Sequence, residues 1–145
     1  MLIDSHAHLD YEYEFSTAEM LASAKAAGID RVIAIAAAPD SLERVRELSE
    51  QFPQIYFTSG IHPHDAKDFT EEIFASVRRL APHPRCVAVG ELGLDYHYDL
   101  SDRATQQQAL QAQLDFSAEI GKPVVVHTRD ADEDTIRFLG DHSRK

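Results

Sequence analysis

Residues 86–96 read Cys86-Val87-Ala88-Val89-Gly90-Glu91-Leu92-Gly93-Leu94-Asp95-Tyr96, so a short apolar run leads almost directly into a carboxylate. The run from Cys86 to Val89 is continuous rather than alternating, which is typical of a strand buried on both faces of a parallel sheet. A carboxylate that follows such a strand is costly to bury unless another group pairs with it. This stretch therefore predicts a parallel strand that presents Glu91 at its carboxyl end.

Similar apolar runs recur along the chain, at Leu2-Ile3, Arg31–Ala38, Ile55–Ser59 and Pro123–Val126. Amphipathic stretches with helix-start and helix-stop signals lie between these runs. Ser16 and Glu19 form a predicted capping box before a helix that ends at Gly28, and Asp40 and Glu43 stand in the same relation before the second helix. Thr70 precedes Glu71 and Glu72 in the first turn of the third helix. The fourth helix is predicted from about Asp102 to Ile120, and Gly121 and Pro123 end it. A last helix begins near Ala131, which completes a strand–helix pattern that is repeated five times.

This alternation predicts right-handed crossovers and an α/β fold with parallel strands. An open doubly wound sheet is complete in five strands, whereas a β/α barrel needs eight strands and typically about 250 residues. The length of 145 residues favours the open sheet, but the motifs described below favour the barrel. We expect residues 1–145 to form one domain, part of a TIM-type (β/α) barrel with about five of its eight βα units. The first and fifth strands of such a part would have open apolar edges.

Composition and charge narrow the class of protein. The 25 acidic and 14 basic residues give a formal charge of −11, the opposite of what binding nucleic acid by electrostatics alone requires. If the chain handles phosphates, bound cations must supply the attraction. The single cysteine, Cys86, excludes an internal disulfide and is expected to be a core residue. The sequence also lacks a signal peptide and an apolar stretch of membrane-spanning length, and these features together predict a cytoplasmic protein without membrane contact.

Two His-x-His pairs follow predicted strands. His6 and His8 follow the first apolar run, and alternate residues of a strand project from the same face, so both imidazoles could reach one metal ion. His62 and His64 follow the third run, where they could bind a metal ion, a phosphate or a leaving group. The other histidines that we considered lie in predicted loops or helices and are interpreted as ordinary: His83, His97 and His142.

Further candidate residues follow the fourth and fifth runs. Glu91 could bridge two metal ions with one oxygen to each, and ions about 3.5–4 Å apart can clamp a phosphodiester between them. His127 ends the fifth strand, and Arg129 lies one step into the loop, where it could bind a phosphate or pair with an acid. Contact with substrate and a structural role explain Asp95 and Tyr96 equally well. Because the carboxyl ends of parallel strands gather at one face, these candidates are predicted to form one site.

The four motifs together resemble those of the TatD-type metal-dependent hydrolases, whose opening is similar to residues 2–10. Residues 60–64, 90–96 and 126–131 resemble the family's next motifs, in order and with suitable spacing, so the resemblance covers essentially the whole chain. It implies an amidohydrolase-like barrel and a deoxyribonuclease that depends on two divalent cations (Mg, Mn or Zn). It implies that His6 and His8 bind one metal, that Glu91 bridges to a second and that His127 binds the second. Substrate-binding roles are implied for His62, His64 and Arg129, and we assign catalytic roles to Glu91, His62 and His64.

The chain also departs from the family pattern. In the family, a histidine at the end of strand six and an aspartate at the end of strand eight complete the ligand set, and neither motif occurs before Lys145. We therefore expect the N-terminal part of a hydrolase, with little nuclease activity in the 145-residue chain alone.

The expected function is hydrolysis of phosphodiester bonds of DNA, single-stranded or at 3′ ends, by water activated between two metals. The full-length protein is expected to be a monomer. The alternatives are hydrolysis of an ester or amide in the same metal site, or an incomplete fragment that binds only a metal or a partner.

Overall fold

A computed structural model describes residues 1–142 of the chain. It contains a single parallel sheet of five strands: β1 (Leu2–Ala7), β2 (Ile29–Ala34), β3 (Ile55–Ser59), β4 (Cys86–Asp95) and β5 (Val124–Arg129). The strands lie side by side in chain order, and every neighbouring pair is parallel. A doubly wound sheet reverses its strand order at a switch point, whereas a barrel adds each strand beside the last. The predicted partial barrel is therefore confirmed.

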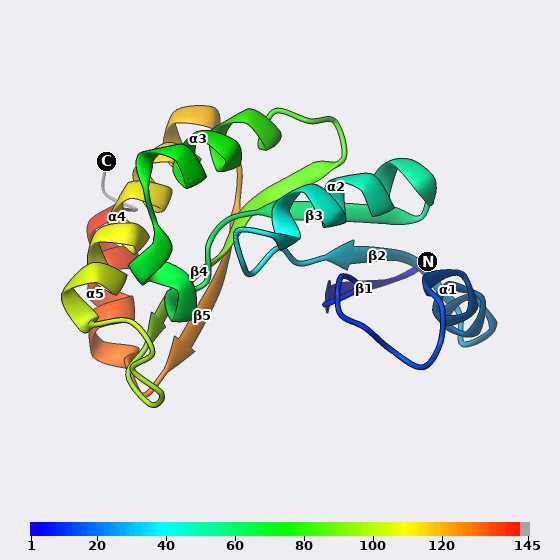
Figure 1. Cartoon of the computed structure of the whole chain (residues 1–145), viewed down its shortest axis with the longest axis horizontal. Coiled ribbons are helices and arrows are strands. Elements are labelled where there is room, and N and C mark those ends of the chain that lie inside the picture. Colours follow the sequence, from blue (N-terminus) through cyan, green and yellow to red (C-terminus); the bar gives the residue numbers. More distant parts are fainter. Residues whose placement is uncertain (143–145) are drawn as a thin grey trace.

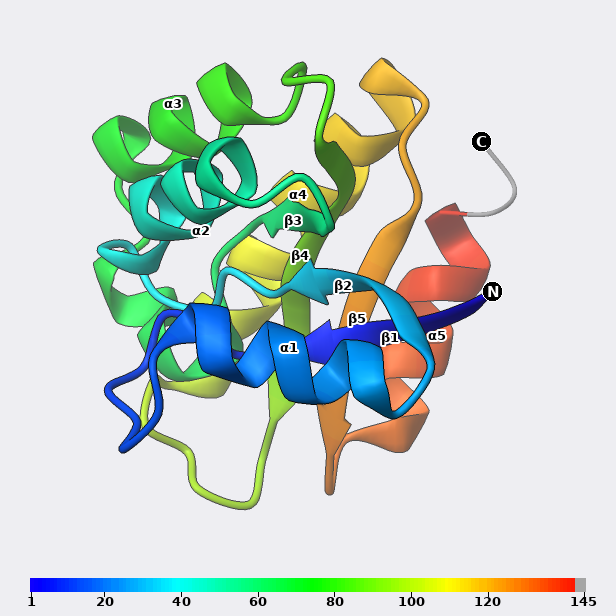
Figure 2. The same cartoon turned by 90° about the vertical axis from the view of Figure 1, so that its right-hand side faces the viewer.

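The sheet is strongly curved, and helices cover its outer side. In Figure 1 the arrow of β2 lies nearly horizontal whereas β5 runs down the page, so strand direction rotates across the sheet. Figure 2 shows the same strands with α1 in front of them and α5 behind β5. The helices are α1 (Thr17–Ala26), α2 (Ser41–Gln51), α3 (Glu71–Leu80), α4 (Arg103–Ile120) and α5 (Asp132–His142), and a 3-10 helix, η1, spans Pro63–Asp68.

Most of the predicted helix signals act as expected. Ser16 and Glu19 form the reciprocal capping box of α1, with the Ser16 hydroxyl accepting from the Glu19 N–H. The Thr70 and Asp102 side chains accept backbone N–H bonds at the starts of α3 and α4. Gly121 ends α4 in the left-handed conformation, at φ +65°.

The predicted capping box at the start of α2 is wrong. Asp40 has helical backbone angles and its side chain makes no capping bond. The Ser41 hydroxyl instead organises the segment before the helix, where it accepts from the N–H groups of Ala37 and Ala38 and donates to the Ala38 carbonyl. Glu43 is therefore free to pair with arginine, and it contacts Arg46 at 2.7 Å.

Two strands extend further than their apolar runs. β4 was predicted to end at Val89, yet it continues to Asp95, paired with β3 up to Val89 and with β5 at Val89 and again from Leu92 to Asp95. β5 includes Arg129, which was predicted to lie in the following loop. Glycines interrupt the apolar run of β4, so its continuation cannot be read from the run itself.

Gly93 lets β4 and β5 approach closely at the point where the candidate residues lie. Its φ is +148°, and a Cβ atom there would lie 1.9 Å from the His127 carbonyl oxygen. No side chain fits at that distance, and the backbone conformation also disfavours every residue except glycine. The glycine therefore brings the backbone of His127 against β4.

Burial follows the position of each strand in the sheet. The central strands β3 and β4 are mostly buried, whereas Leu2 and Ile3 of β1 are 56% and 45% exposed. Residues Ile3, Ile33, Tyr56 and Val87 also line an apolar hollow of about 400 Å³ on the sheet. The predicted burial on both faces thus fails for β1, in agreement with the predicted open apolar edge.

Cys86 begins β4 and is 2% exposed, as predicted for a core residue. Burial raises the pKa of its thiol to about 11, so the thiol stays protonated and unreactive near neutral pH. Among residues 1–142, no helix combines the length and apolar character that crossing a bilayer requires.

We predict that Gly93→Ala destabilises the chain by more than about 3 kcal/mol, because the new methyl group would overlap the β5 backbone. Gly121→Ala is the matched control, since its φ is also positive but a Cβ atom there meets nothing within 4 Å, and its expected cost is about 1 kcal/mol. Urea unfolding of both variants measures the difference. Equal losses would show that β4 and β5 do not approach as described.

Candidate metal centre

One group of potential metal ligands joins β1 to β4. His6 lies in β1, His8 follows it, and Glu91 lies within β4; one potential ligand atom of each lies within 4.8 Å of the others. The His6 Nε2 atom is 3.3 Å from the Glu91 Oε2 atom. Strands three places apart in a flat sheet would be about 14 Å apart, since neighbours are about 4.8 Å apart. The contact exists because the sheet curves and these side chains point toward its inside.

His8 gives the first group an unsatisfied atom. Its Nδ1 is buried and has no hydrogen-bond partner within the described part of the chain. Its ring stacks on that of Tyr11, with ring centroids 5.2 Å apart and planes 4° from parallel. Since a buried polar nitrogen without a partner is costly, a cation held by His6, His8 and Glu91 fits this donor set.

A second histidine group lies beside the first. His62 precedes η1, His64 lies within it and His127 lies in β5, with their potential ligand atoms within 4.8 Å of one another. The ring of His62 is 4.3 Å from the rings of both other histidines. The structure therefore brings together at one end of the sheet all six of the histidine and glutamate residues that the sequence singled out.

Glu91 connects the two groups. Its Oε2 atom faces His6, and its Oε1 atom is 3.4 Å from the Nδ1 atom of His127. Each Glu91 carboxylate oxygen thus faces a histidine from a different strand. This is the arrangement that a carboxylate bridging two cations requires.

The surroundings change the charge states of these groups. Burial alone would raise the pKa of the Glu91 carboxyl, but His127, His62 and His6 together hold it below its usual value. The contact with Glu91 and, to a smaller extent, the contact with Asp95 raise the pKa of His127, although burial alone would lower it. Burial and the neighbouring His127 lower the pKa of His62 to about 4, so this ring is neutral near pH 7.

The neutral His62 ring has a defined polarity. Its Nδ1 atom accepts the backbone N–H of His64 at 3.1 Å, so its proton lies on Nε2. The same bond makes His62 the N-cap of η1, which Pro63 begins. His62 can therefore donate to an acceptor in the site through Nε2.

Asp95 was left open between a substrate contact and a structural role, and the structure shows it fully buried. Its Oδ2 atom lies 2.8 Å from the His64 Nε2 atom and 3.0 Å from the His127 Nε2 atom. Burial alone would raise its pKa, but the Tyr98 N–H and these two histidines hold the pKa far below its usual value. The available signal was its spacing of four from Glu91, since such residues share one face of a strand.

Tyr96 takes a structural role. Its hydroxyl bonds to Asp134 at 2.7 Å and to the Gln107 amide at 2.7 Å, and the Arg103 guanidinium lies over its ring. The histidines interpreted as ordinary have acidic partners outside the two groups: Glu50 for His83, Asp130 for His97 and Asp115 for His142.

Arg129 lies at the end of β5 but outside the histidine groups. Its guanidinium stacks over the ring of Tyr98, 4.6 Å from the ring centre. No ion pair within residues 1–142 involves Arg129, so the predicted alternative of a salt bridge is not observed.

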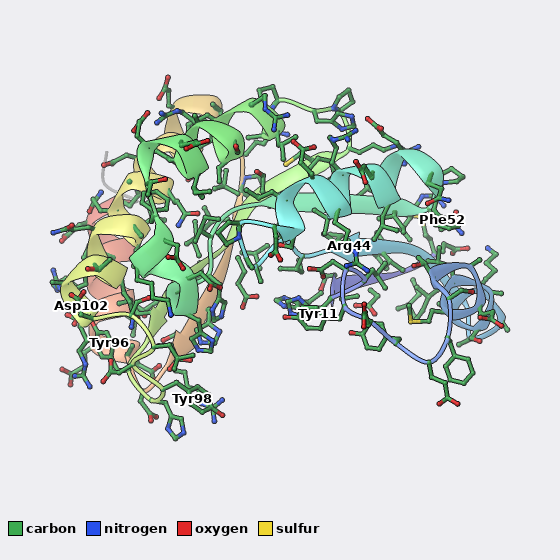
Figure 3. The ribbon with its side chains drawn as sticks, viewed as in Figure 1. Tyr11, Arg44, Phe52, Tyr96, Tyr98 and Asp102 are labelled. Carbon is green, nitrogen blue, oxygen red and sulfur yellow. The ribbon has the colours of Figure 1, made fainter. Side chains whose placement is uncertain are left out.

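The two groups share one hollow of about 310 Å³. Besides both His-x-His pairs, Glu91 and His127, it is lined by Tyr11 and Asp65. In Figure 3, Tyr11 is labelled near the end of β1, and Tyr98 is labelled lower, near the ends of β4 and β5. Most of the side chains that line the hollow are imidazoles and carboxylates, the ligand types that bind divalent transition metals.

The family model described as TatD related DNase matches residues 3–145. The chain is 38% identical over 140 residues to a protein of Bacillus subtilis named uncharacterized metal-dependent hydrolase YabD, covering 96% of this chain and 55% of YabD. It is 35% identical over 120 residues to a protein of Cronobacter turicensis named 3′-5′ ssDNA/RNA exonuclease TatD, covering 83% of this chain and 46% of that protein. The chain thus spans about half the length of the curated relatives it matches.

Solved structures agree with the fold. The TatD homologue YJJV of Escherichia coli superposes with a TM-score of 0.89 at 29% identity, over 97% of this chain and 56% of that one. A TatD family hydrolase of Entamoeba histolytica gives a TM-score of 0.88 at 20% identity, over 99% of this chain and 55% of that one, which supports the fold alone.

We predict that His6→Ala and Glu91→Gln each weaken the binding of Zn²⁺ or Mn²⁺ at least tenfold (about 1.4 kcal/mol), because each removes a candidate ligand. Isothermal titration of the chelator-treated chain measures the affinity. His83→Ala is the control, since His83 pairs with Glu50 outside the candidate groups. Unchanged affinity in Glu91→Gln would remove this residue from the site.

Proposed function

The chain belongs to the family of TatD-related DNases, whose members include metal-dependent hydrolases, and from that premise we propose that it serves the hydrolysis of phosphodiester bonds in single-stranded DNA. The observation that carries the proposal is the position of Glu91, whose Oε2 atom faces His6 and whose Oε1 atom faces His127. Two divalent cations held by these residues would supply activated water and neutralise the charge of a phosphodiester.

In this proposal the ligands divide between two cations. His6, His8 and Glu91 hold one, and Glu91 and His127 contribute to the second. Imidazole and carboxylate ligands suit Zn and Mn, whereas Mg prefers oxygen ligands, and the choice among Mg, Mn and Zn belongs to experiment. Bound cations would also offset the negative charge of the chain, because a formal net charge of −11 repels DNA.

We assign the phosphate to His62 and Arg129, whereas a phosphate contact of His64 stays a prediction, because its Nε2 atom faces Asp95 at 2.8 Å. His62 supports this role because its neutral ring can donate through Nε2, whereas its Nδ1 is engaged with the His64 backbone. Arg129 supports it because its guanidinium has no acidic partner within the described residues and stands beside the site on the Tyr98 ring. A guanidinium in this state can bind two phosphate oxygens at once.

Exposed aromatic rings favour a single-stranded substrate. Tyr11 is 54% exposed and has one face stacked on His8, and Tyr98 is 51% exposed beside Arg129. Bases stack on such rings only when they are free of a duplex. The name of the Cronobacter relative, a 3′-5′ ssDNA/RNA exonuclease, points the same way, whereas the name of the Bacillus relative specifies only a metal-dependent hydrolase.

Three further expectations from the sequence stay predictions. They are a monomeric state at full length, a cytoplasmic location and low nuclease activity of the 145-residue chain alone. The last follows from two family ligands that have no counterpart among these residues.

Turnover is therefore best measured in two forms: the 145-residue chain, and the same chain continued by the C-terminal part of the Bacillus subtilis relative that lies beyond the matched region. With Mn²⁺ or Mg²⁺ and an end-labelled single-stranded oligonucleotide, we expect the continued form to release 5′-nucleotides and the short form to release few. His6→Ala and Glu91→Gln should abolish the release. A continued form that cleaves esters or amides, but not DNA, would favour the alternative hydrolase.

Substrate contacts are tested by Arg129→Ala in the continued form. Loss of two charge-assisted bonds to phosphate should raise the KM for single-stranded DNA about tenfold or more, with metal affinity unchanged. Arg137→Ala is the control, because Arg137 pairs with Asp134 on α5. An unchanged KM in Arg129→Ala would exclude this residue from the phosphate site.

A further inference from the structure

We propose that Asp95 is the positioning residue of the site: it holds His64 and His127 by their Nε2 atoms, so that the Nδ1 atom of each ring is left for other partners. The role of His127 as a metal ligand rests on the proposed function, whereas the orientation of the two rings does not.

Asp95 cannot act by touching substrate, because it is fully buried. Both of its oxygens are engaged: Oδ2 by the Nε2 atoms of His64 and His127, at 2.8 and 3.0 Å, and Oδ1 by the backbone N–H groups of His97 and Tyr98, at 3.1 and 2.8 Å. An ionised carboxylate only accepts hydrogen bonds, so both histidines donate to it.

The consequence is clearest at His127. Its Nε2–H is directed to Asp95, and its Nδ1 atom faces Glu91 at 3.4 Å. A neutral imidazole that donates through one nitrogen presents a lone pair on the other, which is the form that binds a cation. Without Asp95, the ring could place its proton on either nitrogen and could rotate away from Glu91.

The position of Asp95 is itself fixed from α4. The buried Gln106 side chain accepts the Asp95 N–H at 2.8 Å and donates to the Asp95 carbonyl at 3.0 Å and to the Ser101 carbonyl at 2.8 Å. The Ser101 hydroxyl in turn donates to the His64 carbonyl at 2.8 Å. One buried hydrogen-bond network thus fixes both Asp95 and the backbone of His64, whose ring Asp95 holds. Apolar packing of the core alone would not require these hydrogen bonds.

The first experiment needs no variant and no metal. Nitrogen-15 NMR of the metal-free chain at about pH 9, above the usual range of histidine pKa values, reads the protonated nitrogen of each ring. We expect His64 and His127 to carry their protons on Nε2. A proton on Nδ1 of His127 would overturn the proposal, whatever the chain does with metals or DNA.

The second experiment compares Asp95→Asn with Asp130→Asn. Both remove one negative charge from an aspartate that contacts a histidine, but Asp130 is exposed and pairs with His97 outside the site, at 2.9 Å. Asparagine also tolerates the positive φ of Asp130, +53°. The measured quantities are the affinity for Mn²⁺ or Zn²⁺ and, in each variant, the protonated nitrogen of His127.

We expect Asp95→Asn to weaken metal binding about 10- to 100-fold and to mix the two proton positions of His127, and Asp130→Asn to change neither. Wild-type affinity in a folded Asp95→Asn chain would overturn the proposal. If instead the wild-type chain binds no metal while His127 still carries its proton on Nε2, the proposed function fails and the positioning role stands. If Asp95→Asn does not fold, the wild-type NMR measurement decides.

Discussion

An ionised carboxylate inside a protein has to be matched by positive charge or by hydrogen-bond donors, and β4 carries two of them on one face. Glu91 is 7% exposed and Asp95 is fully buried. Removing each from water costs several kcal/mol unless partners restore the lost interactions. The partners come from β1, from the segment after β3 and from β5, so three other elements of the fold converge on β4.

This convergence requires a curved sheet with closely spaced strands. A flat sheet would hold His6 far from Glu91, and a side chain at Gly93 would push β5 away from β4. The backbone of Gly60 meets that of Gly90 in the same manner, since a Cβ atom on Gly60 would lie 2.5 Å from the Gly90 Cα atom. Curvature and glycine thus serve the same end, which is to bring histidines onto two buried carboxylates.

Glu91 and Asp95 have different roles because they lie at different depths from the surface. Glu91 lines the open hollow together with His6, His8 and His127. Asp95 lies behind the histidines, out of contact with solvent, and can act only through them. A site that binds metal needs both kinds of group, one to hold the ion and one to orient the rings that hold it.

The sequence by itself determined the order of strands and helices, the end of the sheet at which the site lies, and the identity of the residues that gather there. These follow from local rules, since continuous apolar runs, caps and residues placed after strands depend only on neighbours in the chain. It did not reveal the extension of β4 to Asp95 or the buried role of Asp95. Only the tertiary structure decided these points, because each depends on groups distant in sequence: the β5 backbone beside Gly93, and the rings of His64 and His127 around one carboxylate.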